Sequence, residues 1–589
     1  MIEYCVKGGI NNMSNKIKGK NKLFYSLVFL VTILFFTIIY KSIGIYYAIN
    51  DDTSMRKITA GSFDGNPDAH MVYIRYVLGV ILSFVFKKVG GIDWYGLFML
   101  GTMALSISSI VYKLVLCSKN NKSKYTVVSG LLLIFVLFFR HIAAFQWTVV
   151  AGIAVTAVIV LLILKEEKYK TDFESVMIIL LSVIAFTIRK KVFFMTAPLI
   201  FFVLFGLYFL PIAKKGIDLI GLKKLARPII WFLVIGLFFG MIEVVDKKAY
   251  SDGEWKMYRA FNSARSRVMD YGGFPLYEGN EEFYDGLGIS KEEAACLEMF
   301  DILENIDVEK MNAIADYCAS QKKDKTIEER LYKMGGVAKT AITSEKCFAA
   351  NVIAAIGVLY LLIDMLRNRK NILTKLLGLM TQFGVLLYLI YMGRFPTRII
   401  WIFDFYTIFF CFAMILSETE RVSDRKKIGV VLRMIFLVLL CRLSLLEIKN
   451  TVEAAIDYET GVMQLSEIDE YVRAQDGANI FIRTGMRMTR TREQFTVHKE
   501  LESVNKFGTA GWSSHAPYMN RKKEMAGIDL NDKTVLLNDN VKFLTDKLED
   551  ADRICEYYST IKEGVWYEIE ECREFSGGLE VYVCLFHEK

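Results

Sequence analysis

Long apolar runs alternate with short polar segments along most of this chain. A helix of roughly 20 apolar residues crosses the hydrocarbon core of a bilayer, and many of the runs approach or reach that length. The charged residues gather between the runs, so the pattern is typical of a polytopic membrane protein. We predict eleven membrane-spanning helices, at 24–45, 94–117, 125–140, 143–164, 174–189, 192–211, 228–246, 347–366, 372–392, 398–416 and 428–446.

One further run, Met71–Val89, is ambiguous because it is short, carries Arg75 near its start and ends in Lys87 and Lys88. If it spanned the membrane, the five later basic loops would all lie outside, against the preference of Lys and Arg for cytoplasmic loops. If it lies at the outer interface instead, those loops fall inside together with the basic N-terminus. The loops concerned are Lys119–Lys124, Lys165–Lys170, Lys214–Arg227, Arg367–Lys370 and Arg421–Lys427.

The charge pattern therefore predicts a multi-pass cell-membrane protein with its N-terminus in the cytoplasm and its C-terminus outside. We expect an all-α polytopic fold with a helical outer loop and a small α+β domain at the C-terminus. The expected parts are a cytoplasmic N-terminus (1–23), a transmembrane domain (24–446) that includes outer loops 50–93 and 246–346, and an extracytoplasmic domain (447–589).

Two of the polar segments carry local secondary-structure signals. In the second outer loop, Ser290 followed by Lys-Glu-Glu predicts the start of a helix, because a serine hydroxyl caps free backbone N–H groups. In the C-terminal segment, β-like runs at 534–537, 565–569 and 579–586 and a helix-like run at 541–557 predict the α+β domain.

Composition narrows the possible functions. The chain has 589 residues, of which 53% are hydrophobic and 13% aromatic, and a formal net charge of +8. Because the basic residues occur in short inter-helix clusters, the positive charge does not indicate a nucleic-acid partner. No glycine-rich phosphate loop, paired-cysteine metal motif or nucleic-acid motif occurs.

The polar segment after the first apolar run carries the main candidate chemistry. It begins with Asp51 and Asp52 and continues through Asp64 and Asp68 to His70. A solvated helix cap is the ordinary alternative for the first two aspartates. The sequence from Gly65 to Asp68 is turn-forming, and Asp68 would also suit the cap of a helix that starts near His70.

Arginines at predicted outer helix ends form a second candidate group, because they depart from the positive-inside trend. A guanidinium holds phosphate oxygens in a two-pronged fork, whereas snorkelling to lipid headgroups is the alternative. Arg394 and Arg398 are the favoured pair, since a proline-containing turn between two helices orients them. The residues concerned are Arg140, Arg189, Arg394 and Arg398.

This layout resembles the GT-C superfamily of integral membrane glycosyltransferases. The resemblance rests on an acidic first outer loop followed by an interfacial helix, and it covers about residues 20–446. Three short segments also resemble those of bacterial members, namely Arg140–Thr148, Phe261–Tyr271 and Gly393–Arg398.

The resemblance implies an inverting glycosyltransferase that uses a polyprenyl-phosphate or polyprenyl-diphosphate sugar donor. The family's base is an acidic residue of the first outer loop, which Asp51 and Asp52 match here, and the sequence does not decide between them. Asp68, His70, Arg140, Arg394 and Arg398 are the expected substrate-binding residues. No metal ligand is assigned, although a divalent cation stays open as a cofactor.

The expected function is transfer of a sugar from the lipid carrier to a glycan, lipid or protein acceptor at the outer cell surface. The expected partners are thus the polyprenyl-linked donor, a cell-surface acceptor and membrane lipid. The alternative is a polysaccharide polymerase or a lipid-linked glycan transporter. A transporter should carry charges or broken helices at mid-membrane, and the predicted spans carry few charges.

Overall fold

The computed structural model describes residues 2–589 apart from 122–123, 217, 271–272, 300–305, 324–325, 394, 419–426, 476, 478, 484–493, 496–504, 509–510 and 514. The chain divides into two compact units, each built from three separate segments. Unit 1 comprises 1–45, 96–242 and 333–455, and unit 2 comprises 46–95, 243–332 and 456–589.

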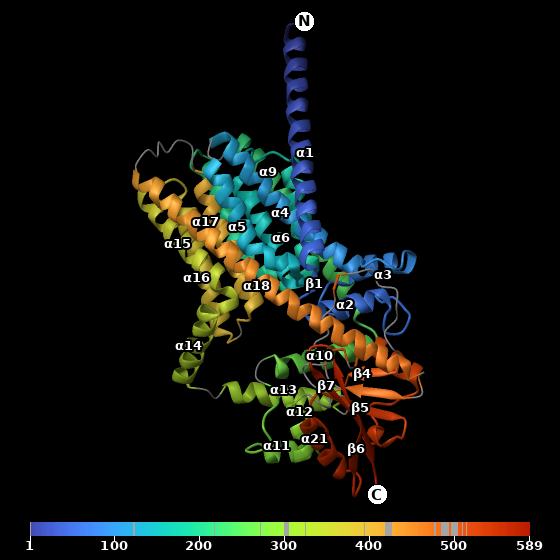
Figure 1. Cartoon of the computed structure of the whole chain (residues 1–589). Helices are drawn as coiled ribbons and strands as arrows, with labels where there is room; N and C mark the ends of the chain where they lie inside the picture. Colours follow the sequence, from blue (N-terminus) through green and yellow to red (C-terminus); the bar gives the residue numbers. More distant parts are fainter. Residues whose placement is uncertain are drawn as a thin grey trace. The chain divides into compact units, whose positions relative to one another are not determined.

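Unit 1 is a bundle of long apolar helices (Figure 1). Eight helical segments of the described residues are long and apolar enough to cross a membrane, which supports membrane insertion as the sequence predicts. They are Lys22–Ile43, Trp94–Cys117, Trp147–Leu164, Phe173–Ala213, Leu219–Ala249, Glu345–Arg367, Ile372–Tyr391 and Thr397–Leu416.

The predicted number of eleven spans is not confirmed. The expected spans 174–189 and 192–211 form one helical stretch, which leaves helical geometry at Arg189 (φ −149°, ψ 91°) and contains Pro198 and a π-helical turn. The expected span 125–140 lies in a helix whose apolar part, Val127–Ala143, is shorter than the others. The expected span 428–446 is the first part of a 48-residue helix, Lys427–Ala474.

The helices of unit 1 pack around α6 (Trp147–Leu164), in which every residue is buried. A helix that is apolar on all sides is stable only when other helices surround it, and α7 and α17 pack against this one. The helices with most of their length in this unit are α1 (Ile2–Ile43), α4 (Trp94–Asn121), α5 (Lys124–Ala143), α7 (Phe173–Leu204), η1 (Phe205–Phe209), α8 (Leu210–Ala213), α9 (Leu219–Ala249), α14 (Ile327–Thr343), η2 (Glu345–Cys347), α15 (Phe348–Arg367), α16 (Ile372–Tyr391), α17 (Thr397–Leu416) and α18 (Lys427–Ala474), and strand β2 is Ala144–Phe145.

Unit 2 begins with β1 (Tyr46–Tyr47), α2 (Asn50–Ala60) and α3 (Tyr76–Lys88). Helix α3 occupies the ambiguous apolar run and has 13 residues, so at 1.5 Å per residue it is about 20 Å long and too short to cross a bilayer core of about 30 Å. The second segment is helical, as predicted, with α10 (Gly253–Met269), α11 (Glu281–Gly286), α12 (Lys291–Glu298) and α13 (Val308–Lys323) around a shared apolar core. The Ser290 cap is confirmed, since its hydroxyl accepts the Glu293 N–H at 3.1 Å.

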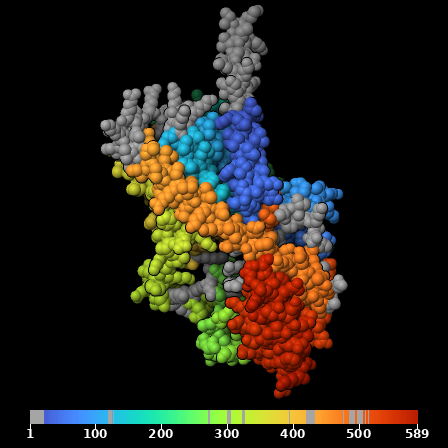
Figure 2. Space-filling model, viewed as in Figure 1, coloured from blue at the N-terminus to red at the C-terminus, as the bar shows by residue number. Residues whose placement is uncertain are grey.

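The C-terminal segment carries a five-stranded mixed sheet in the order β4-β3-β5-β7-β6. Strands β4, β3 and β5 are parallel, and β7 pairs antiparallel with β5 and β6. The red surface in Figure 2 is the last part of this segment. Its elements are β3 (Ile480–Arg483), β4 (Lys506–Gly508), α20 (Pro517–Ala526), η3 (Val535–Leu537), β5 (Val541–Thr545), α21 (Leu548–Ser559), β6 (Trp566–Phe575) and β7 (Leu579–His587).

Two local predictions in this segment are wrong. The run 534–537 is a 3₁₀ turn rather than a strand, and the start of the expected helix 541–557 is the buried strand β5. A short apolar run is compatible with a helix or a strand. Here the run at 541–545 is a strand because it forms hydrogen bonds with both β3 and β7.

Candidate functional site

The two candidate aspartates lie in the first turn of α2. Acidic side chains are favoured there by the helix dipole. Since neighbouring helical residues point about 100° apart, the two carboxylates have different surroundings. Asp52 is fully buried, whereas Asp51 is partly exposed.

Asp52 is held from inside the unit. The Tyr95 hydroxyl donates a hydrogen bond to its Oδ1 at 2.7 Å. Next to this pair, the Tyr47 hydroxyl donates to the buried carboxylate of Asp93, and the two tyrosine rings lie 6.1 Å apart. These contacts fix the direction of the Asp52 carboxyl and keep it away from solvent.

Asp51 is held by the C-terminal segment. The indole N–H of Trp512 donates to Asp51 Oδ1 at 2.9 Å. Trp512 is itself anchored, because its carbonyl accepts the Tyr258 hydroxyl at 2.7 Å and its ring meets the Tyr73 ring edge-on at 4.9 Å. All three segments of unit 2 therefore contribute to the surroundings of Asp51.

Asp64 and Asp68 share one arginine from the same C-terminal region. Arg521 on α20 donates to Asp64 Oδ2 at 2.6 Å and to Asp68 Oδ2 at 3.3 Å. Burial acts to raise the pKa of Asp68, but the hydrogen bonds from His70 and the charge of Arg521 outweigh it and leave this pKa below its usual value. Asp68 is therefore an ionised partner of Arg521 and His70 at neutral pH.

Most of the His70 side chain is covered, and 13% of it is exposed. Its ring stacks on Trp255 at 4.1 Å and contacts Tyr76 and Tyr250. Nδ1 lies 2.6 Å from Asp68 Oδ1, and Nε2 lies 3.1 Å from the carbonyl oxygen of Ala249. Both nitrogens face acceptors, so the ring can donate to both only as an imidazolium ion. This arrangement suits an anchor of the loop better than a proton shuttle.

Two glycines let the first loop fold back on itself. Gly61 ends α2 in the left-handed region (φ 73°), and a Cβ there would lie 2.6 Å from the Pro67 nitrogen. A Cβ on Gly79 of α3 would lie 1.8 Å from the Ala69 carbonyl oxygen. Between them Val72 also has a positive φ (68°), which is costly for a β-branched residue. Its N–H donates to the Tyr250 hydroxyl at 3.0 Å.

The expected turn at Gly65–Asp68 is present, since the Asn66 N–H donates to Asp64 Oδ1 at 3.0 Å. The expected helix near His70 starts later, at Tyr76, so Asp68 does not cap it. Arg75 precedes that helix and binds Asp246 at 2.6 Å and Glu243 at 3.1 Å. The loop is thus tied to the second segment of unit 2 by ion pairs.

The candidate arginines belong to unit 1. Arg140 donates to the Lys346 carbonyl at 3.3 Å and lies 3.6 Å from Glu447. The Trp401 indole donates to the same carbonyl at 3.0 Å, so Arg140 lies close to the first turns of α17, where Arg398 is found. Arg394 lies outside the described residues.

Arg189, the fourth of the arginines that the sequence predicts at outer helix ends, lies over the Trp147 ring at 4.3 Å. Trp147 starts α6, just after the helix that carries Arg140. Two separate pairs of a basic and an indole group are thus found at helix ends or breaks of unit 1: Arg140 and Trp401 share one carbonyl, and Arg189 packs on Trp147.

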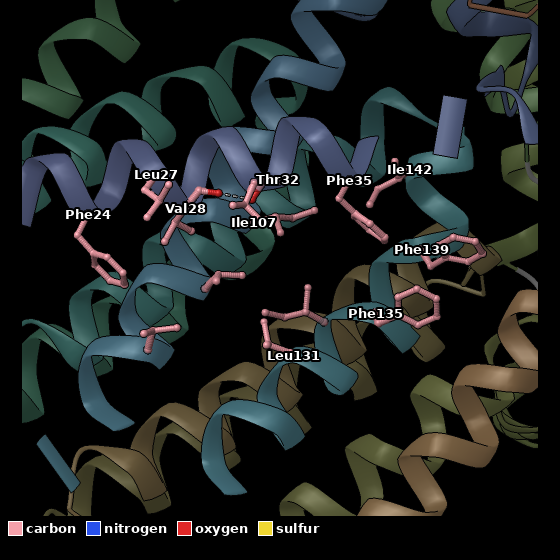
Figure 3. Close-up of a pocket in the computed structure, with 14 residues that line it drawn as sticks. Phe24, Leu27, Val28, Thr32, Phe35, Ile107, Leu131, Phe135, Phe139 and Ile142 are labelled. Atoms are coloured by element: carbon pink, nitrogen blue, oxygen red, sulfur yellow. Dashed lines mark hydrogen bonds between the residues drawn. The ribbon is translucent and has the colours of Figure 1, made fainter. Parts of the chain in front are cut away.

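A cavity of about 450 Å³ in unit 1 is lined by α1, α4 and α5 (Figure 3). Its walls are Phe, Leu, Val and Ile side chains, and the one hydroxyl among them, Thr32, donates to its own helix at the Val28 carbonyl (2.9 Å). The cavity suits a hydrocarbon chain and offers no group for catalysis.

No group of three or more His, Cys, Asp or Glu side chains among the described residues is arranged to hold a metal ion. No known family model matches the chain, and comparisons with curated proteins and with solved structures give no match either. The site must therefore be judged on its own geometry.

Sequence reasoning missed the residues that hold the aspartates. Trp512 and Arg521 come from the last segment, which contributes little to the family resemblance. Tyr95 begins an apolar helix and gave no polar signal. The string Gly511-Trp512 comes a few positions after the strand that ends at Gly508, and loops that follow a strand often carry functional residues.

Proposed function

We propose that this chain is a membrane glycosyltransferase that moves a sugar from a polyprenyl-phosphate or polyprenyl-diphosphate carrier to a glycan, lipid or protein acceptor at the outer cell surface. The observation that supports it best is the state of Asp51. This carboxylate is partly exposed, and the indole N–H of Trp512, from a distant segment of the chain, donates a hydrogen bond to it.

In this reaction Asp51 is the base. It takes the proton of the acceptor hydroxyl as that oxygen attacks the anomeric carbon of the sugar. The bond from that carbon to the phosphate oxygen breaks, and the lipid phosphate leaves with the electron pair. Asp52, with no exposed surface, keeps the first turn of α2 in place through Tyr95.

Arg140, Arg394 and Arg398 are the proposed phosphate ligands, with Asp68 and His70 as supports of the loop. A guanidinium near the leaving phosphate would stabilise the charge that develops there. A divalent cation would serve the same purpose, although the described residues hold no ready-made group of ligands for one.

The proposal includes an orientation, with the N-terminus in the cytoplasm and unit 2 outside. The three segments of unit 2 nearly coincide with the three that the charge pattern assigns to the outside. Segments that pack into one body are expected on one side of the membrane, which supports a common side for these three, and the charge pattern is what favours the outside.

The test is transfer of a sugar from a polyprenyl-phosphate donor in membranes that contain the full chain. Asp51→Asn should reduce transfer by a factor of about 10²–10⁴ while the amount of inserted protein is unchanged. Asp539→Asn, at an exposed residue of unit 2, is the matched control and should transfer normally.

Normal transfer by Asp51→Asn together with loss in Asp52→Asn would move the role of base to Asp52. Normal transfer by both single variants and by the double variant would refute a glycosyltransferase that works through these carboxylates.

A lipid-linked glycan transporter is the second candidate. It is favoured by the break at Arg189 within α7 and by a buried acid, Asp404, inside α17. Movement of a fluorescent polyprenyl-linked sugar across vesicles, without loss of the sugar, would support this candidate over the first.

A further inference from the structure

Helix α17 contains a single acidic residue, Asp404. It is the eighth residue of a membrane-spanning candidate, so it lies about 10 Å along the helix from its start. Only 4% of the residue is exposed. An acid at such a depth is rare in membrane helices and usually has a function.

Two other acids of unit 1, the buried Glu418 and the partly buried Glu174, have a cation beside them. Glu418 lies 2.5 Å from the Lys375 amine, and Glu174 lies 2.8 Å from the Lys113 amine. For Asp404, no ion pair with any described residue exists, and its buried Oδ2 has no hydrogen-bond partner among them. The charges of Glu418 and Glu174 are therefore compensated by lysines, whereas Asp404 has no such cation among the described residues.

Among the described residues, no side chain of the elements packed on α17 forms an ion pair with Asp404. On α5, the buried ring of His141 packs against the Trp401 and Phe405 rings of α17, with ring centroids 4.5 and 5.4 Å apart. Helix α6 has no charged side chain, and the charged groups Asp364 and Lys375 of α15 and α16 meet Glu418 at the far end of α17. The Cys347 thiol and the Tyr406 hydroxyl interact electrostatically with Asp404. At the near end, the guanidinium of Arg140 lies beside Glu447.

Uncharged polar groups do occur at this level of the bundle. Thr407 is one turn further along α17, and its hydroxyl, like that of Tyr406, is buried with no partner in the described part of the chain. The side-chain amide of Gln382 on α16 is also buried and has no hydrogen-bond partner among the described residues.

Gln382 belongs to the same layer as these hydroxyls. Helices α16 and α17 are joined by a short turn and run antiparallel. Gly378 lies against the Phe410 ring, where an added Cβ would be 2.2 Å from Cζ. One turn later on α16 is Gln382, and one turn earlier on α17 is Tyr406.

We propose that Asp404 is an intramembrane proton-binding site, in which the carboxyl group is held as the neutral acid beside the polar groups of α16 and α17. An ionised carboxylate without a cation in such surroundings costs several kcal/mol, whereas the neutral acid can donate its O–H to an amide or hydroxyl oxygen. The bound species is a proton, which is released only when water or a cation enters between these helices. The inference does not depend on the glycosyltransferase proposal.

The test uses dicyclohexylcarbodiimide, an apolar reagent that modifies protonated carboxyl groups, on the full chain in membranes at neutral pH. Mass spectrometry should find the adduct on Asp404 and several-fold less on Glu418, whose carboxylate is paired with Lys375. The peptide of Asp404→Asn should carry no adduct. In Lys375→Met, Glu418 loses its cation and should become reactive, which shows that the reagent reaches a buried acid in this bundle.

An unmodified Asp404 alongside a modified Glu418 in Lys375→Met would overturn the proposal. Thermal unfolding gives a second readout that does not depend on the reagent. Asn resembles the neutral acid, so Asp404→Asn should unfold at nearly the same temperature as the parent. A large drop in that temperature would mean that Asp404 is ionised and paired, and would also contradict the proposal.

Discussion

Acids at helix ends of unit 1 and the two acids that begin α2 in unit 2 are held by different kinds of donor. In unit 1 the acids at helix ends are neutralised by lysine amines, as Glu418 is by Lys375. In unit 2 the acids of α2 accept hydrogen bonds from neutral donors, the Tyr95 hydroxyl and the Trp512 indole. A cation stabilises a carboxylate through its full charge, whereas a hydroxyl or indole N–H does so through a hydrogen bond alone. The Lys375–Glu418 pair and the two hydrogen bonds at the start of α2 therefore differ in the kind of donor that holds the acid.

The largest effect should come from breaking the charge cluster of unit 1. Lys375 is fully buried and lies within 2.6 Å of both Asp364 and Glu418. Lys375→Met would leave two carboxylates without their cation and should cost about 3–5 kcal/mol of stability, measured by thermal unfolding in detergent. Adding Glu418→Gln should restore part of the loss. An unchanged unfolding temperature in the single variant would show that the cluster contributes nothing.

Unit 2 should instead respond to acid through a histidine. His515 stacks on Phe261 at 3.9 Å, and burial together with the nearby Lys523 charge lowers its pKa from 6.5 to about 4. The unfolded chain therefore binds this proton first, and stability is complete above pH 6.5 and declines as the pH falls towards 4. The loss at the acid end should be at most about 3 kcal/mol.

Protease resistance of unit 2 as a function of pH measures this effect. His515→Phe keeps an aromatic ring on Phe261 and should flatten the profile between pH 6.5 and 4. A profile that keeps its slope in this variant would assign the acid sensitivity to other groups.

A smaller effect should follow from filling the close contact between α3 and the first loop. Gly79→Ala places a methyl group against the Ala69 carbonyl and should cost about 1–3 kcal/mol. Gly101 is a helical glycine of unit 1 with nothing within 4 Å of an added Cβ. Gly101→Ala should be neutral or stabilising by up to about 1 kcal/mol. Equal effects of the two changes on thermal unfolding would contradict the close contact.

Sequence reasoning was effective where the signal is local. The apolar runs revealed a membrane protein, the serine at 290 indicated its helix cap, and the length of Met71–Val89 agreed with a short helix. Sequence reasoning was less effective at deciding where one helix ends and the next begins. A continuous helix that bends at Arg189 has the same apolar pattern as two separate membrane spans. The strand at Val541–Thr545 was missed because its neighbours in the sheet, and not its own residues, select the extended state.

For the candidate site, the sequence indicated which acids to consider but not how each is held. Asp51 and Asp52 are adjacent, and only their surroundings distinguish a partly exposed carboxylate from a buried one. The donors come from Trp512 and Tyr95, whose contacts depend on the folded chain. Asp404 was visible in its span, but its lack of a cation could be recognised only once the neighbouring helices were known.

The hydrogen bond between Asp51 and Trp512 also has a consequence for biosynthesis. Its two residues are 461 positions apart in the chain. At about 5–20 residues per second, a ribosome needs roughly 25–90 seconds to make the residues between them. During that time α2 must wait in an incomplete state, so a nascent chain has its aspartates long before it has the indole that orients them. A chain truncated before Trp512 would keep its membrane helices and never complete this contact.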